Sequence, residues 1–323
     1  YGDVMLDIDI RLLLEFHRKK KSACTLALHP NDHPQDSDLV EIDANQRIAA
    51  FHPKPHSKNE YLSNLVNAGL YVISPEILKY IKRGVKTDWG KDVFPKIVRK
   101  EMLYGYITAE YLKDIGTPKR LSEVRKDYQD GKIPRMNRKN KKRAIFLDRD
   151  GVINETESDV SRINDFKLFP KTAQAVKQIN DSEFLAIVIT NQPAVAKGFC
   201  SMEELENIHK KMETLLGENG AKLDGIYFCP HHPDKGFAGE NLKYKIKCSC
   251  RKPKIGLVKM AEKDFNIDLK HSYFIGDSSR DILCGRKAGM TTIGVKTGRG
   301  CRDGKIKPDF LFEDLKQAIN FII

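Results

Sequence analysis

The residues of this chain with the clearest chemical potential are two carboxylates near its middle, Asp148 and Asp150. They follow an apolar run, residues 144–147, and in an extended strand residues two apart point the same way. Gly151 permits a turn that would aim both carboxylates at one ligand. One carboxylate could then attack an electrophile while the other moves a proton, with a divalent cation between them. Asp and Gly are also common in ordinary turns, so this stretch alone leaves a plain strand end open.

A second group of residues has the spacing of metal ligands. It combines a Cys-x-His pair with a later Cys-x-Cys pair: Cys229, His231, Cys248 and Cys250. Three thiolates and one imidazole suit a closed tetrahedral Zn2+ site, and four protein ligands imply a structural ion. Spacing alone leaves His232 open in place of His231. Residues 233–247 between the pairs are polar and offer no core of their own, so we expect the metal to order them.

The elements that must position these residues alternate between strand and helix after residue 143. The strand signals lie at residues 144–148, 185–190, 225–229, 273–277 and 291–295, and the helix signals at 171–180, 202–216, 255–265 and 280–288. This alternation predicts an α/β fold with a doubly wound, mainly parallel sheet. Asp148, Thr190 and Asp277 each end a predicted strand, and such sheets bind ligands at the carboxyl ends of their strands. Ser201 with Glu204 predicts a capping box for the helix after it.

Length and composition exclude several classes of protein. The 323 residues suffice for two domains with apolar cores, and no apolar run approaches a membrane span or a signal peptide. We therefore expect no membrane partner. Seven cysteines, three of them at metal-ligand spacing, favour a reducing compartment over disulfides, so we expect a cytoplasmic protein.

The net charge of +12 raises the question of nucleic-acid binding. Residues 132–143 hold seven basic residues and no acidic one, but they lack interleaved aromatics and any recognisable nucleic-acid module. We therefore expect no nucleic-acid partner and interpret residues 127–142 as a basic linker between domains at 1–126 and 143–323. Attraction of anionic phosphorylated substrates is a second, weaker account of the charge.

Three later segments carry polar residues in a suggestive order. They are residues 189–192 (Ile-Thr-Asn-Gln), 250–254 (Cys-Arg-Lys-Pro-Lys) and 275–281 (Ile-Gly-Asp-Ser-Ser-Arg-Asp). Alone, each reads as a turn, a solvated surface pair or a loop. Together with Asp148 and Asp150, they resemble the four motifs of the haloacid dehalogenase (HAD) superfamily of phosphohydrolases, from about residue 143 to the end. The resemblance implies a HAD-like Rossmannoid fold.

This resemblance assigns roles to the motif residues. It implies Mg2+ held by Asp148, Asp277 and the main-chain carbonyl of Asp150, because an anionic phosphate ester must be neutralised before a carboxylate attacks it. Asp148 would be the nucleophile that forms an aspartyl-phosphate, and Asp150 the general acid and base. Thr190 and Lys252 would hold the transferring phosphoryl oxygens.

The zinc loop narrows the resemblance within the superfamily. It is similar to the branch that contains the D-glycero-D-manno-heptose-1,7-bisphosphate 7-phosphatases and the histidinol-phosphate phosphatases. The short spacing between the first two motifs leaves no room for a large cap, so the zinc loop and residues 154–159 would shape the substrate pocket. We expect substrate contacts from Asn154, Asn191 and Arg251, the last of these to a second anionic group.

One departure from the family pattern concerns the residue after Gly276-Asp277. The family often has Lys there, whereas this chain has Ser278. A contact to a substrate phosphate is then missing or is supplied elsewhere, for example by Lys197 or Arg280.

The first part of the chain resembles a sugar-phosphate nucleotidyltransferase. The segments that carry this resemblance are residues 1–3, 51–55, 67–71 and 114–118. It implies that Asp3 and Asp114 bind Mg2+, that Lys54 meets the sugar phosphate, and that Asn67 and Gly69 line the sugar site. The family's Gly-rich nucleotide-binding loop is absent from the sequence, so we expect an incomplete domain with no nucleotidyl transfer.

The fusion of the two domains favours one substrate. Removal of the 7-phosphate from heptose 1,7-bisphosphate yields a sugar 1-phosphate, which a guanylyltransferase-like neighbour would use in nucleotide-activated heptose biosynthesis. We therefore expect an enzyme, a Mg2+-dependent phosphatase with Zn2+ and a phosphorylated-sugar substrate. A histidinol-phosphate phosphatase and, from another class, a non-catalytic scaffold protein stay open, as do the anomer and the oligomeric state.

Overall fold

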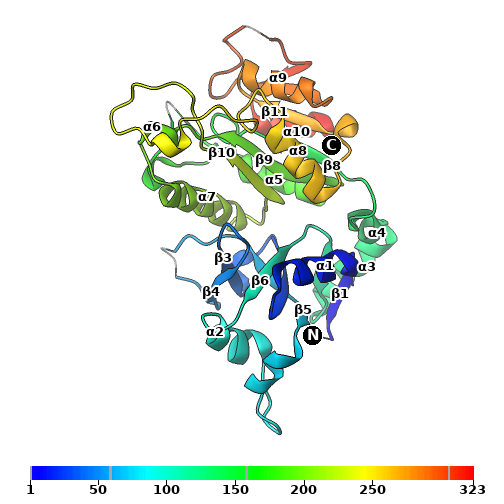
Figure 1. Cartoon of the computed structure of the whole chain (residues 1–323). Helices are drawn as coiled ribbons and strands as arrows, with labels where there is room; N and C mark the ends of the chain where they lie inside the picture. The colour runs from blue at the N-terminus through cyan, green and yellow to red at the C-terminus, as the bar shows by residue number, and fades with distance from the viewer. Residues whose placement is uncertain (1, 58–59, 157–158, 305) are drawn as a thin grey trace. The chain divides into compact units, whose positions relative to one another are not determined.

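The computed structural model of the chain describes residues 2–57, 60–156, 159–304 and 306–323. Tyr1 of the first nucleotidyltransferase-like segment and residues 157–158 of the expected pocket segment lie outside this range. The chain forms two compact units, Tyr1–Asn140 and Lys141–Ile323 (Figure 1). Within the described residues, no helix combines the length and the apolar content that a bilayer crossing requires.

The first unit is an α/β domain built on a mixed sheet of five strands in the order β4-β3-β5-β2-β6. Its strands are β1 (Val4–Asp7), β2 (Cys24–His29), β3 (Leu39–Ile42), β4 (Ile48–His52), β5 (Val66–Ile73), β6 (Leu103–Ile107) and β7 (Tyr111–Asp114). Its helices are α1 (Ile10–Lys20), α2 (Phe94–Ile97), α3 (Pro118–Gln129) and α4 (Lys132–Met136). Two 3-10 helices, Pro34–Asp36 and Pro75–Tyr80, and a π-helix, Trp89–Val93, complete the set. Strands β1 and β7 form a separate antiparallel pair. Helix α1 packs on β2, β5 and β6, around the buried Leu13.

The segment expected to be a linker, residues 127–142, is partly folded into the first unit. Its α4 buries Ile133 against Tyr111 and Val124, with Met136 packed beside them. The compact units divide after Asn140. Ile133 and Met136 lie three residues apart, so one face of a helix can bury both of them. The sequence interpretation as a linker rested on the basic residues and did not use this spacing.

The second unit is a doubly wound domain with a six-stranded sheet in the order β10-β9-β8-β11-β12-β13. All of its strand pairs are parallel. Its strands are β8 (Arg143–Leu147), β9 (Phe184–Asn191), β10 (Gly225–Cys229), β11 (Tyr273–Gly276), β12 (Thr291–Val295) and β13 (Phe310–Phe312). Its helices are α5 (Thr172–Asp181), α6 (Ala194–Lys197), α7 (Met202–Gly217), α8 (Gly256–Phe265), α9 (Ser279–Lys287) and α10 (Leu315–Ile322), with shorter turns at Ile163–Asp165, Leu242–Tyr244 and Leu269–His271.

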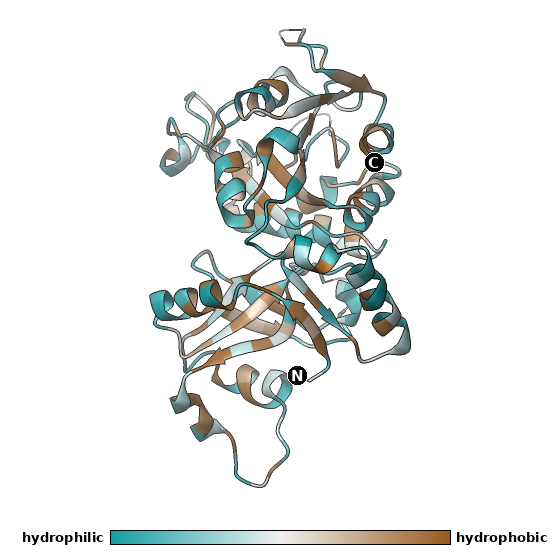
Figure 2. Ribbon diagram, turned by 90° about the vertical axis from the view of Figure 1, so that its right-hand side faces the viewer, coloured by the Kyte–Doolittle hydropathy of each residue, from teal (hydrophilic) through white to brown (hydrophobic). Residues whose placement is uncertain are grey.

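Helices cover both faces of this sheet (Figure 1). Helices α5, α7 and α10 pack on one face, where Ile145 and Leu147 of β8 join the main core, and α8 and α9 pack on the strands from the other side. On that second side Phe146 stacks on Phe274, with ring centroids 6.3 Å apart. In Figure 2 the strands carry mostly hydrophobic residues, whereas the helices alternate hydrophobic and hydrophilic residues along their length. This is the pattern of a sheet buried on both faces.

The predicted parallel sheet is confirmed, and the predicted strands and helices after residue 143 differ from the observed bounds by one residue at most. Ser201 and Glu204 form the predicted capping box at the start of α7. The short elements α6, β13 and α10 were not predicted. The sheet order brings the carboxyl ends of β8, β9 and β11 to one edge, where the motif residues follow.

Candidate active site

The side chain of Lys252 lies at the centre of the site, where it joins two carboxylates. Its Nζ lies 2.8 Å from Oδ1 of Asp148 and 2.7 Å from Oδ1 of Asp281. It also donates to the main-chain carbonyl of Ile189 at 2.8 Å. Three acceptors therefore fix this ammonium group, which is only 2% exposed, beside the carboxylate that the first motif supplies.

Gly151 permits the close approach of the first motif to Asp277. Its φ is +86°, and a Cβ added there would lie 2.1 Å from Oδ2 of Asp277. Glycine is required on both counts, because other residues are strained in this conformation and would collide with the carboxylate. The turn predicted after Asp148 and Asp150 thus packs directly on the carboxylate that follows β11.

Three carboxylates, from Asp148, Asp277 and Asp281, have oxygen atoms within 4.8 Å of one another. Burial, and then the charge of Asp281, raises the pKa of Asp148 well above its usual value and that of Asp277 to about 6. Burial alone would lower the pKa of Lys252, but Asp148 and Asp281 raise it, so Lys252 stays charged. When all three carboxylates are ionised, Lys252 balances only one of their negative charges, so a cation with two positive charges would balance the rest. The donor set therefore fits a divalent cation with oxygen ligands.

The carboxylate of Asp150 is held by side chains that surround it. The guanidinium of Arg149 donates to Oδ1 at 2.8 and 3.0 Å and to Oδ2 at 3.0 Å. Gln192 donates to Oδ2 at 2.8 Å, and Asn154 donates to Oδ1 at 3.0 Å. Arg149 also donates to Oε1 of Gln192 at 3.0 Å and lies over the ring of Phe166. These contacts fix the orientation of Asp150 relative to the site.

Asn154 therefore has a different place from the one expected. We expected it to contact substrate, but its side chain is fully buried and donates to Asp150 and to the carbonyl of Glu155. It does not line the cleft. Its position assigns it to the support of Asp150, because the turn after Gly151 folds the chain back on itself.

Thr190 and Asn191 are the last residues of β9 and lie beside the loop that carries Lys252. The hydroxyl of Thr190, fully buried, accepts from Gln192 at 2.9 Å. Asn191 exchanges two hydrogen bonds with the main chain of Lys252: it accepts from the amide at 2.9 Å and donates to the carbonyl at 3.1 Å. The end of β9 therefore sets the position of the Lys252 side chain.

The Cys/His cluster comes together as the spacing predicted. Its four ligand atoms lie within 4.8 Å of one another: Sγ of Cys229, Cys248 and Cys250, and Nδ1 of His231. Nδ1 of His231 is 3.3 Å from Sγ of Cys250 and 3.6 Å from Sγ of Cys229. His231, not His232, is therefore the histidine of the cluster. Three thiols and an imidazole at these distances suit one tetrahedral ion.

A cleft of about 400 Å³ opens at this edge of the sheet. Asp148, Asp150, Asp277 and Lys252 line it, together with the side chains of Asn191, Lys197, Arg251, Arg280 and Arg299. Arg251 donates to the main-chain carbonyl of His231 at 3.2 Å, which ties the cleft to the Cys/His cluster. Cations on its walls suit an anionic ligand.

Ser278, the residue after Gly276-Asp277, has a local partner. Ser278 forms a capping box with Asp281 at the start of α9: its hydroxyl donates to Oδ2 at 2.5 Å and its amide at 3.1 Å. Burial alone would raise the pKa of Asp281, but Lys252 and Ser278 lower it. Ser278 therefore supports the carboxylate that pairs with Lys252.

The expected site residues of the first unit lie in two groups. An added Cβ on Gly116 would lie 3.0 Å from Oδ1 of Asp114 and 3.4 Å from Oδ2 of Asp3, so both carboxylates flank one point. Lys54 pairs with Asp36 at 2.9 Å, and its amide donates to Asp38. On β5, the side chain of Asn67 accepts from the amide of Gly69 at 3.2 Å, and the amide of Asn67 donates to the carbonyl of Asp38. Asp38 thus joins the lysine and asparagine segments.

Comparison with known proteins gives each unit its own relatives. The nucleotidyl transferase family model matches residues 1–131, and the model described as HAD-hyrolase-like matches residues 249–318. D-glycero-beta-D-manno-heptose-1,7-bisphosphate 7-phosphatase from Haemophilus ducreyi is 38% identical over 184 residues, which cover 56% of this chain and 98% of that protein. The Pasteurella multocida protein of the same name is 37% identical over 54% of this chain and 93% of its own length.

A solved structure agrees with these sequence relatives. It is D,D-heptose 1.7-bisphosphate phosphatase from B. bronchiseptica, complexed with magnesium and phosphate. Its TM-score is 0.50 at 30% identity, and the match covers 56% of this chain and 97% of that one.

Proposed function

Because this chain belongs to the family of D-glycero-D-manno-heptose-1,7-bisphosphate 7-phosphatases, we propose that residues 141–323 hydrolyse the 7-phosphate of this sugar bisphosphate. The single observation that carries the proposal is the buried contact between Lys252 and Asp148, at 2.8 Å, among three clustered carboxylates. A lysine and a cation site beside a nucleophilic carboxylate are what phosphoryl transfer from a dianionic ester requires. The reaction is hydrolysis of a phosphoric monoester.

The proposed first step forms a bond between Asp148 and phosphorus. A carboxylate oxygen of Asp148 attacks, the bond to the sugar oxygen breaks, and Asp150 gives its proton to the departing alkoxide. The ammonium of Lys252 and the hydroxyl of Thr190 hold the phosphoryl oxygens. In the second step Asp150 takes a proton from water, which attacks phosphorus and releases phosphate from Asp148.

Asp148, Asp277 and the main-chain carbonyl of Asp150 would hold Mg2+ in this scheme. Two raised carboxyl pKa values and a cluster with more acids than cations support a divalent ion there. When bound, Mg2+ supplies charge neutralisation for the phosphate and its transition state. The magnesium and phosphate in the B. bronchiseptica structure support the same choice.

We propose Zn2+ for the cluster of Cys229, His231, Cys248 and Cys250. Four protein ligands fill a tetrahedral shell, so the ion would order the loop and leave chemistry to the carboxylates. Because the ligands must be reduced thiolates, we propose the cytoplasm as the compartment.

The first unit is proposed as a sugar-phosphate nucleotidyltransferase domain. Asp3 and Asp114, which flank one point, are the proposed cation ligands, and Lys54, Asn67 and Gly69 the proposed sugar-phosphate contacts. The product of the second unit, a heptose 1-phosphate, has the single anomeric phosphate that such a domain would accept. A small phosphorylated sugar is accordingly the proposed partner of both units.

The test is phosphate release from both anomers of heptose 1,7-bisphosphate and from histidinol phosphate, with and without Mg2+. We expect Mg2+-dependent release from the heptose ester, with one phosphate per sugar, and none from the Asp148→Asn variant. Thermal unfolding of that variant checks that it is folded. Preference for histidinol phosphate would overturn the substrate and spare the mechanism, whereas near-normal turnover by the variant would overturn the nucleophile.

A further inference from the structure

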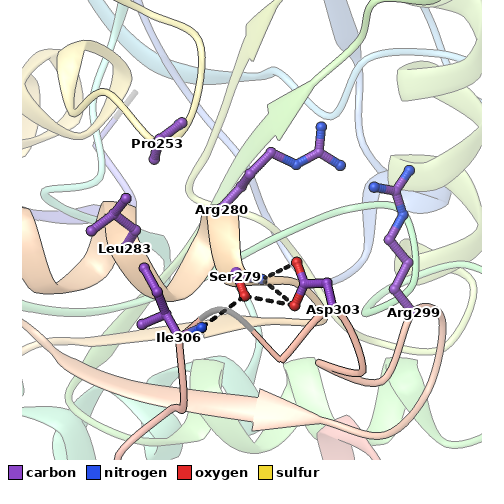
Figure 3. A pocket seen from close by; sticks show the side chains of 7 residues that line it. All are labelled: Pro253, Ser279, Arg280, Leu283, Arg299, Asp303 and Ile306. Atoms are coloured by element: carbon purple, nitrogen blue, oxygen red, sulfur yellow. Dashed lines mark hydrogen bonds between the residues drawn. The ribbon is translucent and has the colours of Figure 1, made fainter.

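Two arginines stand at the boundary between the active-site cleft and a second cavity. Arg280 lies in the first turn of α9, and Arg299 lies in the loop between β12 and β13. Both line the cleft and also the second cavity, which has a volume of about 400 Å³. Figure 3 shows the two side chains coming from separate elements, with both guanidinium groups in the upper part of the view. The second cavity is completed by Pro253, Ser279, Leu283, Asp303 and Ile306.

Within the residues that the structure describes, neither guanidinium has a carboxylate at ion-pair distance. The two lysines of the cleft differ in this respect. Lys197 lies 2.6 Å from Asp159, and Lys252 lies between two carboxylates. Two like charges that face one space repel each other, and an anion between them would turn this repulsion into attraction. The arrangement therefore favours an anionic ligand.

The one carboxylate among the residues that line the second cavity is already engaged. Asp303 accepts from the amide of Ser279 at 3.1 and 3.3 Å and from its hydroxyl at 2.6 Å (Figure 3). The Ser279 hydroxyl in turn accepts from the amide of Ile306 at 3.1 Å. Asp303 thus fastens the loop that carries Arg299 to the start of α9 and leaves the arginines free for a ligand.

The loop is also fastened to the reaction centre. The amide of Arg299 donates to Oδ2 of Asp277 at 2.7 Å, and the amide of Cys301 donates to the Asp277 carbonyl at 2.6 Å. The hydroxyl of Thr297 donates to the carbonyl of Gly151 at 2.7 Å. The backbone of Arg299 therefore has a fixed place beside the carboxylates at which phosphate would react.

We propose that Arg280 and Arg299 together bind the second, non-reacting phosphate of a sugar bisphosphate while the first phosphate lies at Asp148. Planar guanidinium groups bind phosphate oxygens in pairs, which fixes both position and orientation. The arginine pair thereby supplies the contact that Ser278, engaged with Asp281, does not. This inference rests on the proposed function. It adds Arg280 and Arg299 to Arg251, the cleft residue from which the sequence predicted a contact to a second anionic group, as residues that select a bisphosphate over a monophosphate.

The test compares two substrates that differ only in the second phosphate, heptose 1,7-bisphosphate and heptose 7-phosphate. Arg280→Ala and Arg299→Ala should each lower kcat/KM for the bisphosphate about 10- to 100-fold, mostly through KM, as loss of a charge-assisted hydrogen bond does. For the 7-phosphate the loss should be several-fold smaller. The preference for the bisphosphate, measured as its kcat/KM divided by that of the 7-phosphate, should therefore fall. Arg302→Ala is the matched control, since this exposed arginine of the same loop lines neither cavity.

The outcomes separate the inference from the proposed function. Equal losses on both substrates, or no loss in a variant that carries both Arg280→Ala and Arg299→Ala, would overturn the arginine subsite and leave the proposed phosphatase activity standing. If the unaltered chain releases phosphate from neither heptose ester, the proposed function is wrong, and the subsite falls with it. A lower preference for the bisphosphate in Arg280→Ala and in Arg299→Ala, with an unchanged preference in Arg302→Ala, supports the subsite.

Discussion

The guanidinium of Arg149, with no solvent exposure, binds the carboxylate of the next residue, Asp150, through three hydrogen bonds of 2.8 to 3.0 Å. Neighbours along a strand point to opposite faces, so only the turn after β8 lets these two side chains meet. The same guanidinium reaches Gln192 after β9. A buried arginine therefore ties the proposed acid to two strand ends of the sheet.

The first prediction concerns this arginine as a positioning residue. Arg149→Met should lower kcat for a sugar phosphate about 100-fold, the usual size of a general acid–base contribution. It should affect p-nitrophenyl phosphate much less, because nitrophenolate leaves without a proton. Asn154→Ala, which removes one hydrogen bond to Asp150, should show the same pattern more weakly. Arg162→Met, at an exposed side chain, is the control, and equal losses on both substrates would contradict the role.

The positions of Asp148, Thr190 and Asp277 at one edge of the sheet were predictable, because β8, β9 and β11 are buried apolar runs that stop at a polar residue. Asp148, Thr190 and Asp277 follow such runs, and a parallel sheet brings their ends together. The Cys/His cluster was predictable from ligand type and spacing. Side-chain direction after a strand end, however, depends on turn geometry that spacing does not encode.

Arg149 and Asn154 show what this limit means. Arginine is rarely buried, so the sequence favours a solvent-exposed side chain for Arg149, which is in fact fully buried. Its position between Asp148 and Asp150 was the one sign of a contact with a carboxylate. Asn154 sits in the motif but turns to Asp150. Two other elements were missed for different reasons. Strand β13 has only three residues, too few for a recognisable pattern, whereas α10 could have been predicted from its N-cap residue, Asp314.

The second prediction concerns pH and Asp277. Its pKa is raised from 3.8 to about 6, so the folded protein binds this proton more tightly than the unfolded chain does. Stability of the metal-free protein should therefore fall as pH rises from about 4 to 6, as linkage requires. Asp277→Asn should flatten this part of the Tm profile. Because Mg2+ and the proton compete, Mg2+ should raise Tm more at pH 7.5 than at pH 5, and a pH-independent effect would contradict the assignment.

The third prediction compares two glycines with similar positive φ angles. Gly151 has a φ of +86° and would place a Cβ against Asp277, whereas Gly289 has a φ of +80° and open space around it. Gly289→Ala should cost about 1 kcal/mol of unfolding free energy, from backbone strain alone. Gly151→Ala should cost more and should also weaken the Mg2+-induced rise in Tm. Equal losses of stability with unchanged Mg2+ response would show that the close approach to Asp277 does not matter.

The last prediction distinguishes two adjacent histidines at the Cys/His cluster. Nδ1 of His231 lies 3.3 Å from Sγ of Cys250, whereas His232 lines the cleft. His231→Ala should lose bound Zn2+, measured by metal analysis, and residues 233–247 should become sensitive to protease, because the ion orders them. His232→Ala should keep one Zn2+ per chain and resist protease. Since both variants remove one imidazole from the same loop, the reverse result would assign the ligand to His232 instead.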